Sequence, residues 1–259
     1  MGAGELKIDA RRKKILELLN QNGKVIISQL SSDLNATTVT IRNDLDAMER
    51  DGLLERMPGG AVAKNKSFYQ PGYEKLLQVN SDCKQKIAAE TAKIIQNGDT
   101  LFLNAGTTTY YVAVALKQHK NLNIVTNSLS VAMELGQTPS FRVILLGGEI
   151  NARYGFLCGG DAQQQLSKYK ADYAILSLDG VSAKGGITTY HADEAIITQM
   201  MVEQAKELIV VADHSKMGHE GFSLICDFKS VDILVTDKQA DKQTLQDAYD
   251  AGIKVYLAH

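Results

Sequence analysis

The sequence predicts an α/β protein with an N-terminal winged helix-turn-helix followed by an open, mostly parallel α/β domain. Three observations support this fold class. Residues 1–63 contain three short helical segments and then a Pro-Gly-Gly turn between two apolar runs. From residue 76 onward, apolar runs of strand length alternate with helical segments, as in a sheet covered on both faces. The length of 259 residues accommodates two domains.

The first 63 residues give the order helix, helix, helix, hairpin. Asp9 can cap a helix that runs to about residue 20, and Ser28 is predicted to cap a second helix over 29–34. The third helix is expected to begin near Thr37 and to end at residues 51–52. Two short strands are expected within 53–63, on either side of the Pro-Gly-Gly turn.

Residues 64–75 lack a sustained period and contain Pro71-Gly72, so they are expected to form a linker. Residues 76–259 then alternate between helices and strands. The expected helices are 82–96, 107–117, 129–135, 162–166, 193–205 and 243–251. The expected strands are 98–106, 122–127, 141–148, 172–180, 207–213, 231–237 and 253–258.

Composition narrows the classes of protein. No run of about 18 apolar residues is present, so no membrane association is expected, and the charged N-terminus does not resemble a secretory signal. The three scattered cysteines, Cys83, Cys158 and Cys226, suggest reduced thiols in the cytoplasm. Neither they nor His214 and His219 show a metal-ligand spacing, so no metal site and no cofactor are expected.

The third helix has two distinct faces. Ile41, Leu45 and Met48 recur at helical spacing and predict a buried stripe. The opposite face and its flanks carry threonine, arginine and asparagine, whose side chains bond bases and phosphates. The N-terminal half of a recognition helix enters the major groove of DNA. A solvated helix face capped by Thr37 would have the same composition, and the helix alone does not separate these alternatives.

The surrounding sequence favours DNA binding. Arg56 in the hairpin and the basic run 10–14 offer phosphate contacts on both sides of the third helix. The small net charge of −2 means that the placement of charges, rather than their sum, carries this interpretation. The candidate DNA-binding residues are Ser28, Thr37, Thr38, Val39, Thr40, Arg42, Asn43, Arg50, Arg56, Gly59 and Gly60.

The second domain carries a candidate anion site. In Leu103–Thr109 a strand leads into a helix through Gly-Thr-Thr-Thr, so backbone N–H groups and hydroxyls can surround a phosphate. A capped helix start is the structural alternative. Polar residues follow four further strands, and ligands of open α/β sheets bind beyond the carboxyl ends of the strands. The candidate ligand-binding residues are Asn104, Gly106, Thr107, Thr108, Thr109, Thr126, Asn127, Ser128, Gly147, Gly148, Asp179, Glu194 and Lys216.

The segment Thr38–Val62 resembles the helix-turn-helix and wing of the DeoR family of bacterial transcriptional regulators. The resemblance extends over nearly the whole chain. The sequence departs from the family pattern at Thr37, Asn43 and Pro58, where serine, arginine and histidine are usual. The DNA sequence that relatives recognise is therefore not transferred to this chain.

The resemblance implies a function. The chain would be a transcriptional regulator, in most cases a repressor, of a carbohydrate-utilisation operon. Its second domain would be a sensor similar in fold to ribose-5-phosphate isomerase, with a phosphorylated sugar as effector. The threonine turn would bind the phosphate, while Asp179, Glu194 and Lys216 would meet the sugar. Asn104 stands where the family usually has aspartate. A homo-oligomer, dimer or tetramer, is expected on double-stranded operator DNA with repeated half-sites.

An enzyme is the alternative interpretation, namely a sugar-phosphate isomerase with an accessory DNA-binding domain. Asp179, Glu194 and Lys216, together with Lys184, are residue types that such chemistry uses. The paired acids of the isomerase are absent, however, because Val181 and Ser182 follow the Asp-Gly. We therefore expect a sensor without catalytic residues. His191 is expected to be a surface histidine and Cys158 a small apolar residue in a turn.

Overall fold

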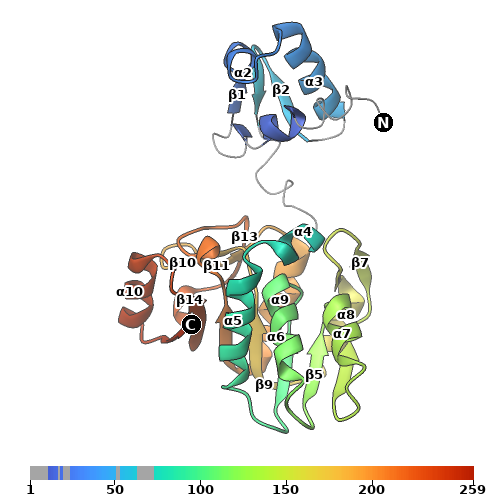
Figure 1. Ribbon diagram of the computed structural model, residues 1–259. Helices are drawn as coiled ribbons and strands as arrows, with labels where there is room; N and C mark the ends of the chain where they lie inside the picture. The colour runs from blue at the N-terminus through green and yellow to red at the C-terminus, as the bar shows by residue number, and fades with distance from the viewer. Residues whose placement is uncertain (1–10, 17, 20–23, 51–52, 63–72) are drawn as a thin grey trace. The chain divides into compact units, whose positions relative to one another are not determined.

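The computed structural model describes residues 11–16, 18–19, 24–50, 53–62 and 73–259 (Figure 1). The chain divides into two compact units, Met1–Gln70 and Pro71–His259. Most of the predicted linker 64–75 lies outside the described residues, and its last three residues already belong to helix α4 (Tyr73–Gln78). None of the described helices is both long and apolar enough to cross a membrane.

The first unit is a small α/β domain. Residues 11–16 and 18–19 are helical. Strand β1 (Lys24–Ile26), helix α2 (Ile27–Asp33), helix α3 (Thr38–Arg50) and strands β2 (Glu55–Met57) and β3 (Gly60–Val62) follow. The antiparallel sheet has the order β1-β3-β2. The predicted hairpin is confirmed, whereas β1 was not predicted because three residues are too few to show a strand period.

The predicted N-cap at Ser28 is wrong. Helix α2 begins at Ile27, two residues earlier than predicted and directly after β1, and its N-cap is Ile26 without a side-chain hydrogen bond. The Ile27 N–H donates instead to the carbonyl of Gly59 at 2.9 Å. The turn of the hairpin therefore satisfies the first N–H group of α2, and Ser28 lies exposed within the first turn of the helix rather than at its N-cap.

The buried stripe of α3 is confirmed, since Ile41, Leu45 and Met48 are fully buried. Asp44 lies on the same buried side, where its carboxylate accepts hydrogen bonds from Arg11 at 2.5 Å and from Arg12 at 3.2 Å. These two arginines of the basic run were expected to contact phosphates. They neutralise Asp44 instead, because a buried carboxylate is stable only with a charged partner.

The second unit is built on a seven-stranded sheet in which every pairing is parallel. Its order is β15-β14-β12-β9-β4-β5-β6. The strands are β4 (Thr100–Leu103), β5 (Asn123–Thr126), β6 (Arg142–Leu145), β9 (Ala171–Leu176), β12 (Ala205–Val211), β14 (Ile233–Asp237) and β15 (Lys254–Ala258). The predicted open parallel sheet is confirmed.

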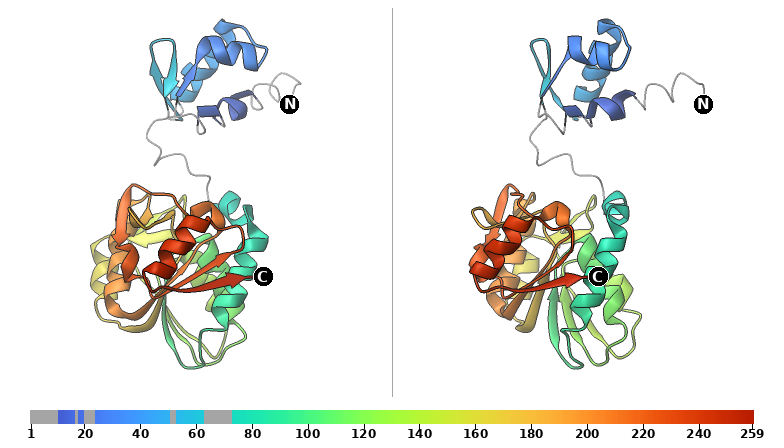
Figure 2. Two further views of the ribbon diagram at one scale, coloured as in Figure 1. Left: turned by 90° about the vertical axis from the view of Figure 1, so that its left-hand side faces the viewer. Right: turned by 60° about the vertical axis from the view of Figure 1, so that its left-hand side comes forward.

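Helices cover both faces of this sheet (Figure 1). Alternate residues of each strand serve the two faces, so Leu101 and Leu103 pack in one apolar core and Phe102 in the other. The first core includes residues of α5 (Ser81–Ala92), α6 (Thr107–Leu116) and α7 (Leu129–Leu135), and the second includes α8 (Gly160–Leu166) and α9 (Ala192–Gln204). Helix α10 (Lys242–Asp250) lies beside β15 (Figure 2).

Short antiparallel elements join the main strands and were not predicted. A sheet with the order β10-β11-β13 is formed by β10 (Gly180–Ser182), β11 (Gly186–Thr189) and β13 (Ser223–Cys226). Strands β7 (Glu149–Asn151) and β8 (Phe156–Cys158) pair with each other. The 3-10 turns η1 (His214–Lys216) and η2 (Phe228–Ser230) complete the unit.

The sheet order defines a switch point. The chain proceeds from β4 through β5 to β6 on one side, and from β9 through β12 and β14 to β15 on the other. Strands β4 and β9 are adjacent, and the connections leave them in opposite directions. In open α/β sheets, ligands bind at this point, beyond the carboxyl ends of the strands.

Candidate functional site

The outer face of α3 presents exposed side chains, most of them polar. Thr38, Val39, Arg42, Asn43 and Arg50 are exposed, and Val39 is 61% accessible. The Thr37 hydroxyl accepts the Thr40 N–H at 3.1 Å and so caps the helix, which is the role that the alternative interpretation of this helix gave it. Within the described part of the chain, the Arg42 guanidinium and the Asn43 amide have no hydrogen-bond partner, so both are available to an external ligand.

Arg56 has a different position. Its Nε donates to Asp46 at 2.8 Å and its Nη1 to the carbonyl of Gly60 at 2.5 Å, while its N–H donates to Glu49 at 2.7 Å. Arg56 therefore fastens the hairpin to α3. Gly60 permits the hairpin to approach β1, because a Cβ there would lie 2.0 Å from the carbonyl oxygen of Val25. DNA contacts by Arg56, Gly59 and Gly60 remain predictions.

In the second unit, the sheet order places the carboxyl ends of β6, β5, β4, β9 and β12 side by side. The candidate ligand-binding residues follow these strands. At the switch point, the Asn104 amide donates to the Ser177 carbonyl at 2.7 Å and accepts the Ser177 N–H at 2.9 Å. Asn104 thereby joins β4 to β9, and both ends of its amide are used.

The threonine turn lies directly beside this contact. Gly106 is the N-cap of α6, and a Cβ at Gly106 would lie 2.6 Å from that of Ser177. The Thr109 hydroxyl donates to the Gly106 carbonyl at 3.0 Å. The hydroxyls of Thr107 and Thr108 have no partner among the described residues. With the free N–H groups of the first helical turn, these two hydroxyls can bind an anion.

The candidates after β5 and β6 mainly stabilise loops. Asn127 accepts the Ala105 N–H at 3.0 Å and donates to the Leu157 carbonyl at 3.2 Å. Thr126 accepts the Ser128 N–H, and Ser128 caps α7. The two candidates after β6 are glycines. Gly147 donates its N–H to Gln165, and Gly148 has a φ of 126°. These residues lie at the carboxyl edge of the sheet, but most of them are already hydrogen-bonded within the protein.

On the other side of the switch point, Asp179 and Lys216 form an ion pair, with 3.5 Å between Oδ1 and Nζ. The second Asp179 oxygen accepts the Thr189 hydroxyl and the Tyr190 N–H, both at 3.0 Å. The Lys216 side chain is 25% exposed. This arrangement holds one carboxylate and one ammonium at the same edge of the sheet, where the carboxyl ends of the strands lie.

Glu194 is buried behind this pair. The Thr189 hydroxyl lies 3.0 Å from Asp179 and 3.2 Å from Glu194, although a hydroxyl can donate only one proton. Two ionised carboxylates at that oxygen would leave one without a donor. Burial, and then the charge of Asp179, raise the pKa of Glu194 to about 8. Glu194 is accordingly protonated at neutral pH and donates to Thr189, which donates to Asp179.

This proton has a consequence for stability. The ordinary pKa of 4.5 applies in the unfolded chain, so the unfolded state ionises first and stability falls as the pH rises from about 4.5 to about 8. Glu194→Gln retains a hydrogen-bond donor and removes the ionisation. We expect the wild type to lose stability relative to Glu194→Gln across this window, by at most about 5 kcal/mol.

Thermal unfolding of the full chain at a series of pH values checks this prediction. Glu203→Gln on the exposed side of the same helix is the matched control and should follow the wild-type profile. Parallel profiles for the wild type and Glu194→Gln would contradict the protonated state of Glu194.

Sequence reasoning missed Lys84. It is buried and donates to the Leu76 carbonyl at 2.5 Å, and burial lowers its pKa to about 8. Lys84 interacts electrostatically with Asp213 and Lys216. The sequence could have revealed Lys84 by its spacing, because it lies on the buried stripe of α5 with Ile87, Ala88 and Thr91, where a lysine is unusual. With a pKa of about 8 the Lys84 ammonium is still mostly charged at neutral pH, so it is suited to an anionic ligand.

His191 was expected to be a surface group, which is wrong. Its ring packs against Tyr154 and Phe156, with centroid distances of 4.5 and 5.7 Å. Burial lowers its pKa. Its Nε2 is buried and has no hydrogen-bond partner in the part of the chain that the structure describes. Such an atom usually has a water or ligand partner.

Asp213 stabilises the local fold. Its carboxylate caps η1 by accepting the Ser215 N–H at 2.9 Å, and it also accepts from Asn80 at 3.1 Å. These bonds position Lys216 next to Asp179, because Lys216 is the last residue of η1. The site thus depends on a capped turn as well as on strand ends.

A winged helix-turn-helix with an exposed, unpaired recognition face places this chain among DNA-binding transcriptional regulators. Comparison with known families identifies both units. Residues 11–67 match the DeoR-like helix-turn-helix domain, and residues 79–238 match the DeoR C terminal sensor domain. The chain therefore belongs to the DeoR family.

Named relatives agree with this assignment. The chain is 32% identical to the glycerol-3-phosphate regulon repressor of Escherichia coli K12, over 97% of this chain and 100% of that one. It is 31% identical to the transcriptional repressor GlcR of Bacillus subtilis, over 89% and 88% of the two chains. Among solved structures, ribose 5-phosphate isomerase A of Methanocaldococcus jannaschii is similar with a TM-score of 0.40, at 19% identity, over 53% and 54% of the chains.

Proposed function

We propose that this regulator represses a carbohydrate-utilisation operon in the cytoplasm and that a phosphorylated sugar controls its binding to operator DNA. The observation that carries the proposal is the pair of unpartnered hydroxyls, Thr107 and Thr108, at the start of α6 and at the switch point of the sheet. Relatives named as repressors, including one of a glycerol-3-phosphate regulon, support the class of effector.

The phosphate is assigned to the start of α6. Helix N-terminal N–H groups and hydroxyls favour a dianion. Lys84 adds positive charge from α5, which packs along α6. Both helices are also bonded to α4, since Tyr111 of α6 donates to the Leu77 carbonyl and Lys84 of α5 to the Leu76 carbonyl. Lys84 has donor capacity left after its bond to Leu76.

The sugar is assigned to the neighbouring strand ends. Asp179 and Lys216 provide an acceptor and a donor for hydroxyl groups, and both are held in place by internal bonds. The unpartnered Nε2 of His191 supplies a further polar atom. Rigid polar groups of this kind select a ligand by its hydroxyl pattern.

Regulation follows from linkage. An effector that binds one arrangement of the sensor domains more tightly shifts the population of that arrangement. Because one helix-turn-helix reads few base pairs, we propose that the regulator acts as a dimer or tetramer whose paired DNA-binding units change their spacing.

A thermal-shift screen of the full chain tests the proposal. The panel is inorganic phosphate, glycerol 3-phosphate, and hexose and hexitol phosphates, each beside its unphosphorylated sugar. We expect at least one phosphorylated sugar to raise Tm and its unphosphorylated form to leave it unchanged. A stabilisation by free sugars that equals that of their phosphates would overturn the phosphate assignment.

We propose that the sensor unit is not an isomerase. Proton abstraction from a sugar needs an ionised carboxylate base, whereas Glu194 is held neutral and Asp179 is bonded to Lys216 and Thr189. The purified chain should not interconvert ribose 5-phosphate and ribulose 5-phosphate. Turnover that is lost in Asp179→Asn would favour the enzyme.

A further inference from the structure

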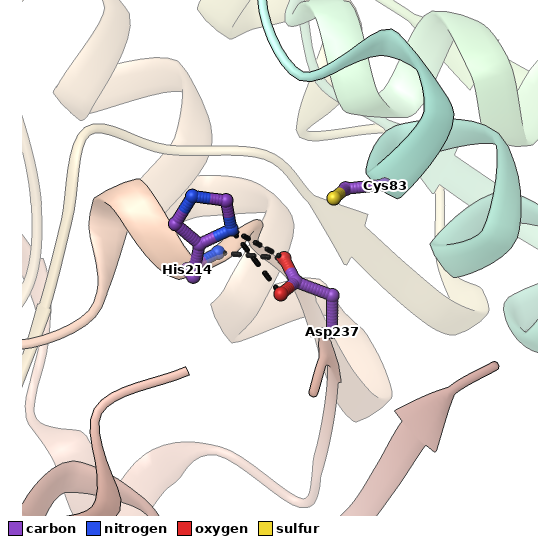
Figure 3. A group of neighbouring side chains, drawn as sticks. All are labelled: Cys83, His214 and Asp237. Atoms are coloured by element: carbon purple, nitrogen blue, oxygen red, sulfur yellow. Dashed lines mark hydrogen bonds and ion pairs between the residues drawn. The ribbon is translucent and has the colours of Figure 1, made fainter. Parts of the chain in front are cut away.

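Three side chains with metal-binding atoms meet at the carboxyl ends of β12 and β14. Cys83 lies in the first turn of α5, His214 opens η1, and Asp237 ends β14. Their ligand atoms all lie within 4.8 Å of one another. Figure 3 shows the Cys83 sulfur pointing toward the His214–Asp237 pair. Sequence spacing could not reveal this group because three separate segments contribute to it.

We propose that Cys83, His214 and Asp237 bind a zinc ion. One thiolate, one imidazole and one carboxylate are ligands that zinc accepts together, whereas magnesium and calcium prefer oxygen alone. Three protein ligands leave a fourth position for water. A site of this kind would join the start of α5 to the edge of the sheet.

The carboxylate is already held in place. One Asp237 oxygen accepts the His214 N–H and the other the Gln239 N–H, each at 2.8 Å. The Asp237 side chain is only 5% exposed, and the His214 Nδ1 lies 3.0 Å from it. Asp237 therefore fixes the position of the imidazole, and on binding the ion would take the place of the Nδ1 proton between the two groups.

The separations fit zinc after a small movement. Tetrahedral coordination with Zn–S of about 2.3 Å and Zn–N of about 2.0 Å places the ligand atoms about 3.3 to 3.6 Å apart. His214 and Asp237 are nearly at that distance, and the Cys83 sulfur, which lies within 4.8 Å of both, has to approach by no more than about 1.5 Å. Cys83 is partly exposed and makes a single weak side-chain contact in the described structure, from Gln239 at 3.9 Å. A change of its side-chain torsion is therefore inexpensive.

The charges around the sulfur also favour a cation. Burial, and then the carboxylates of Asp237 and Asp213, raise the pKa of Cys83. A dication reverses this effect and stabilises the thiolate. On binding, the thiol releases one proton to solvent and the imidazole proton moves from Nδ1 to Nε2, so the metal meets a thiolate, a neutral histidine and a carboxylate.

The arrangement does not fit a cysteine nucleophile with a histidine base. In such a site the carboxylate contacts one ring nitrogen and the thiol the other. Here Nδ1 bonds to Asp237, and Figure 3 shows the second ring nitrogen directed away from Cys83. The sulfur and the carboxylate converge on the same side of the ring, as metal ligands do.

Zinc titration of the untagged full chain against a chromophoric chelator tests the proposal. We expect one zinc ion per chain, with affinity weakened roughly 100-fold or more in Cys83→Ser and in His214→Gln, since loss of even an outer-shell partner costs about 10- to 100-fold. Cys226→Ser, which changes a thiol outside the group, is the matched control and should bind as the wild type does. Cobalt loading should give a thiolate-to-cobalt charge-transfer band in the wild type and not in Cys83→Ser.

Three results would overturn the proposal. They are absence of stoichiometric zinc binding by a wild-type chain that unfolds cooperatively, zinc binding that is unchanged in Cys83→Ser, and a cobalt spectrum without the sulfur band. The far-ultraviolet circular dichroism of each variant establishes that it is folded, so that a loss of binding is attributable to the ligand.

Discussion

Arg42→Ala is expected to weaken binding to duplex DNA selected by the wild-type protein from a random pool by roughly 5- to 150-fold. A well-placed contact from arginine to a base contributes about 1–3 kcal/mol. Arg42 is exposed on the outer face of α3 and has no partner among the described residues, so its removal leaves the fold intact. Fluorescence anisotropy with labelled duplex measures the effect.

The matched control is Arg142→Ala, which removes an equally exposed arginine from β6 in the second unit. It should bind DNA as the wild type does. The dependence of DNA affinity on salt concentration and on DNA sequence shows whether Arg42 contacts a phosphate or a base. Loss of a phosphate contact lowers the salt slope by about 1, whereas loss of a base contact relaxes the sequence preference. Equal affinities for Arg42→Ala and the wild type would exclude α3 as the recognition helix.

Replacing Thr107 and Thr108 together with valine should abolish the response to the sugar phosphate found in the thermal-shift screen. Valine preserves the shape of threonine and removes the two free hydroxyls. A hydrogen bond to a charged group contributes about 1.5–3 kcal/mol, so affinity should fall roughly 100-fold or more. Isothermal titration calorimetry measures the loss, while DNA binding should remain.

Thr109→Val is the control within the same turn. Its hydroxyl already bonds to the Gly106 carbonyl, so the substitution should cost about 1 kcal/mol of stability and leave the effector affinity unchanged. If the double variant still bound the sugar phosphate at wild-type affinity, or if Thr109→Val lost it, the assignment of Thr107 and Thr108 to the phosphate would be wrong.

Periodicity predicted the elements that are regular and long. The stripe of Ile41, Leu45 and Met48 predicts α3 correctly because burial of one helix face depends on local spacing. The Ser28 cap fails because α2 already begins at Ile27, whose N–H donates to the Gly59 carbonyl of the hairpin, a partner far along the chain. Strands of three residues, such as β1 and β10, depend on pairing partners rather than on their own pattern.

The candidate site shows the same limit. The strand ends could be predicted, because parallel strands bring their carboxyl ends to one edge. Which polar groups remain free there depends on tertiary hydrogen bonds. Asn104 is used by Ser177, whereas Thr107 is not. Lys84 could have been found, since it interrupts an apolar helix stripe, but the convergence of Asp179 and Glu194 on Thr189 involves three separate elements.

Occupancy of the sheet edge in the second unit is expected to control DNA binding by the first. Titration of the effective sugar phosphate into preformed protein–DNA complex, followed by fluorescence anisotropy, tests it most directly. We predict that the ligand releases DNA from the wild type and leaves the complex of the Thr107→Val, Thr108→Val variant intact. Release from both complexes at the same ligand concentration, or from neither, would contradict the account.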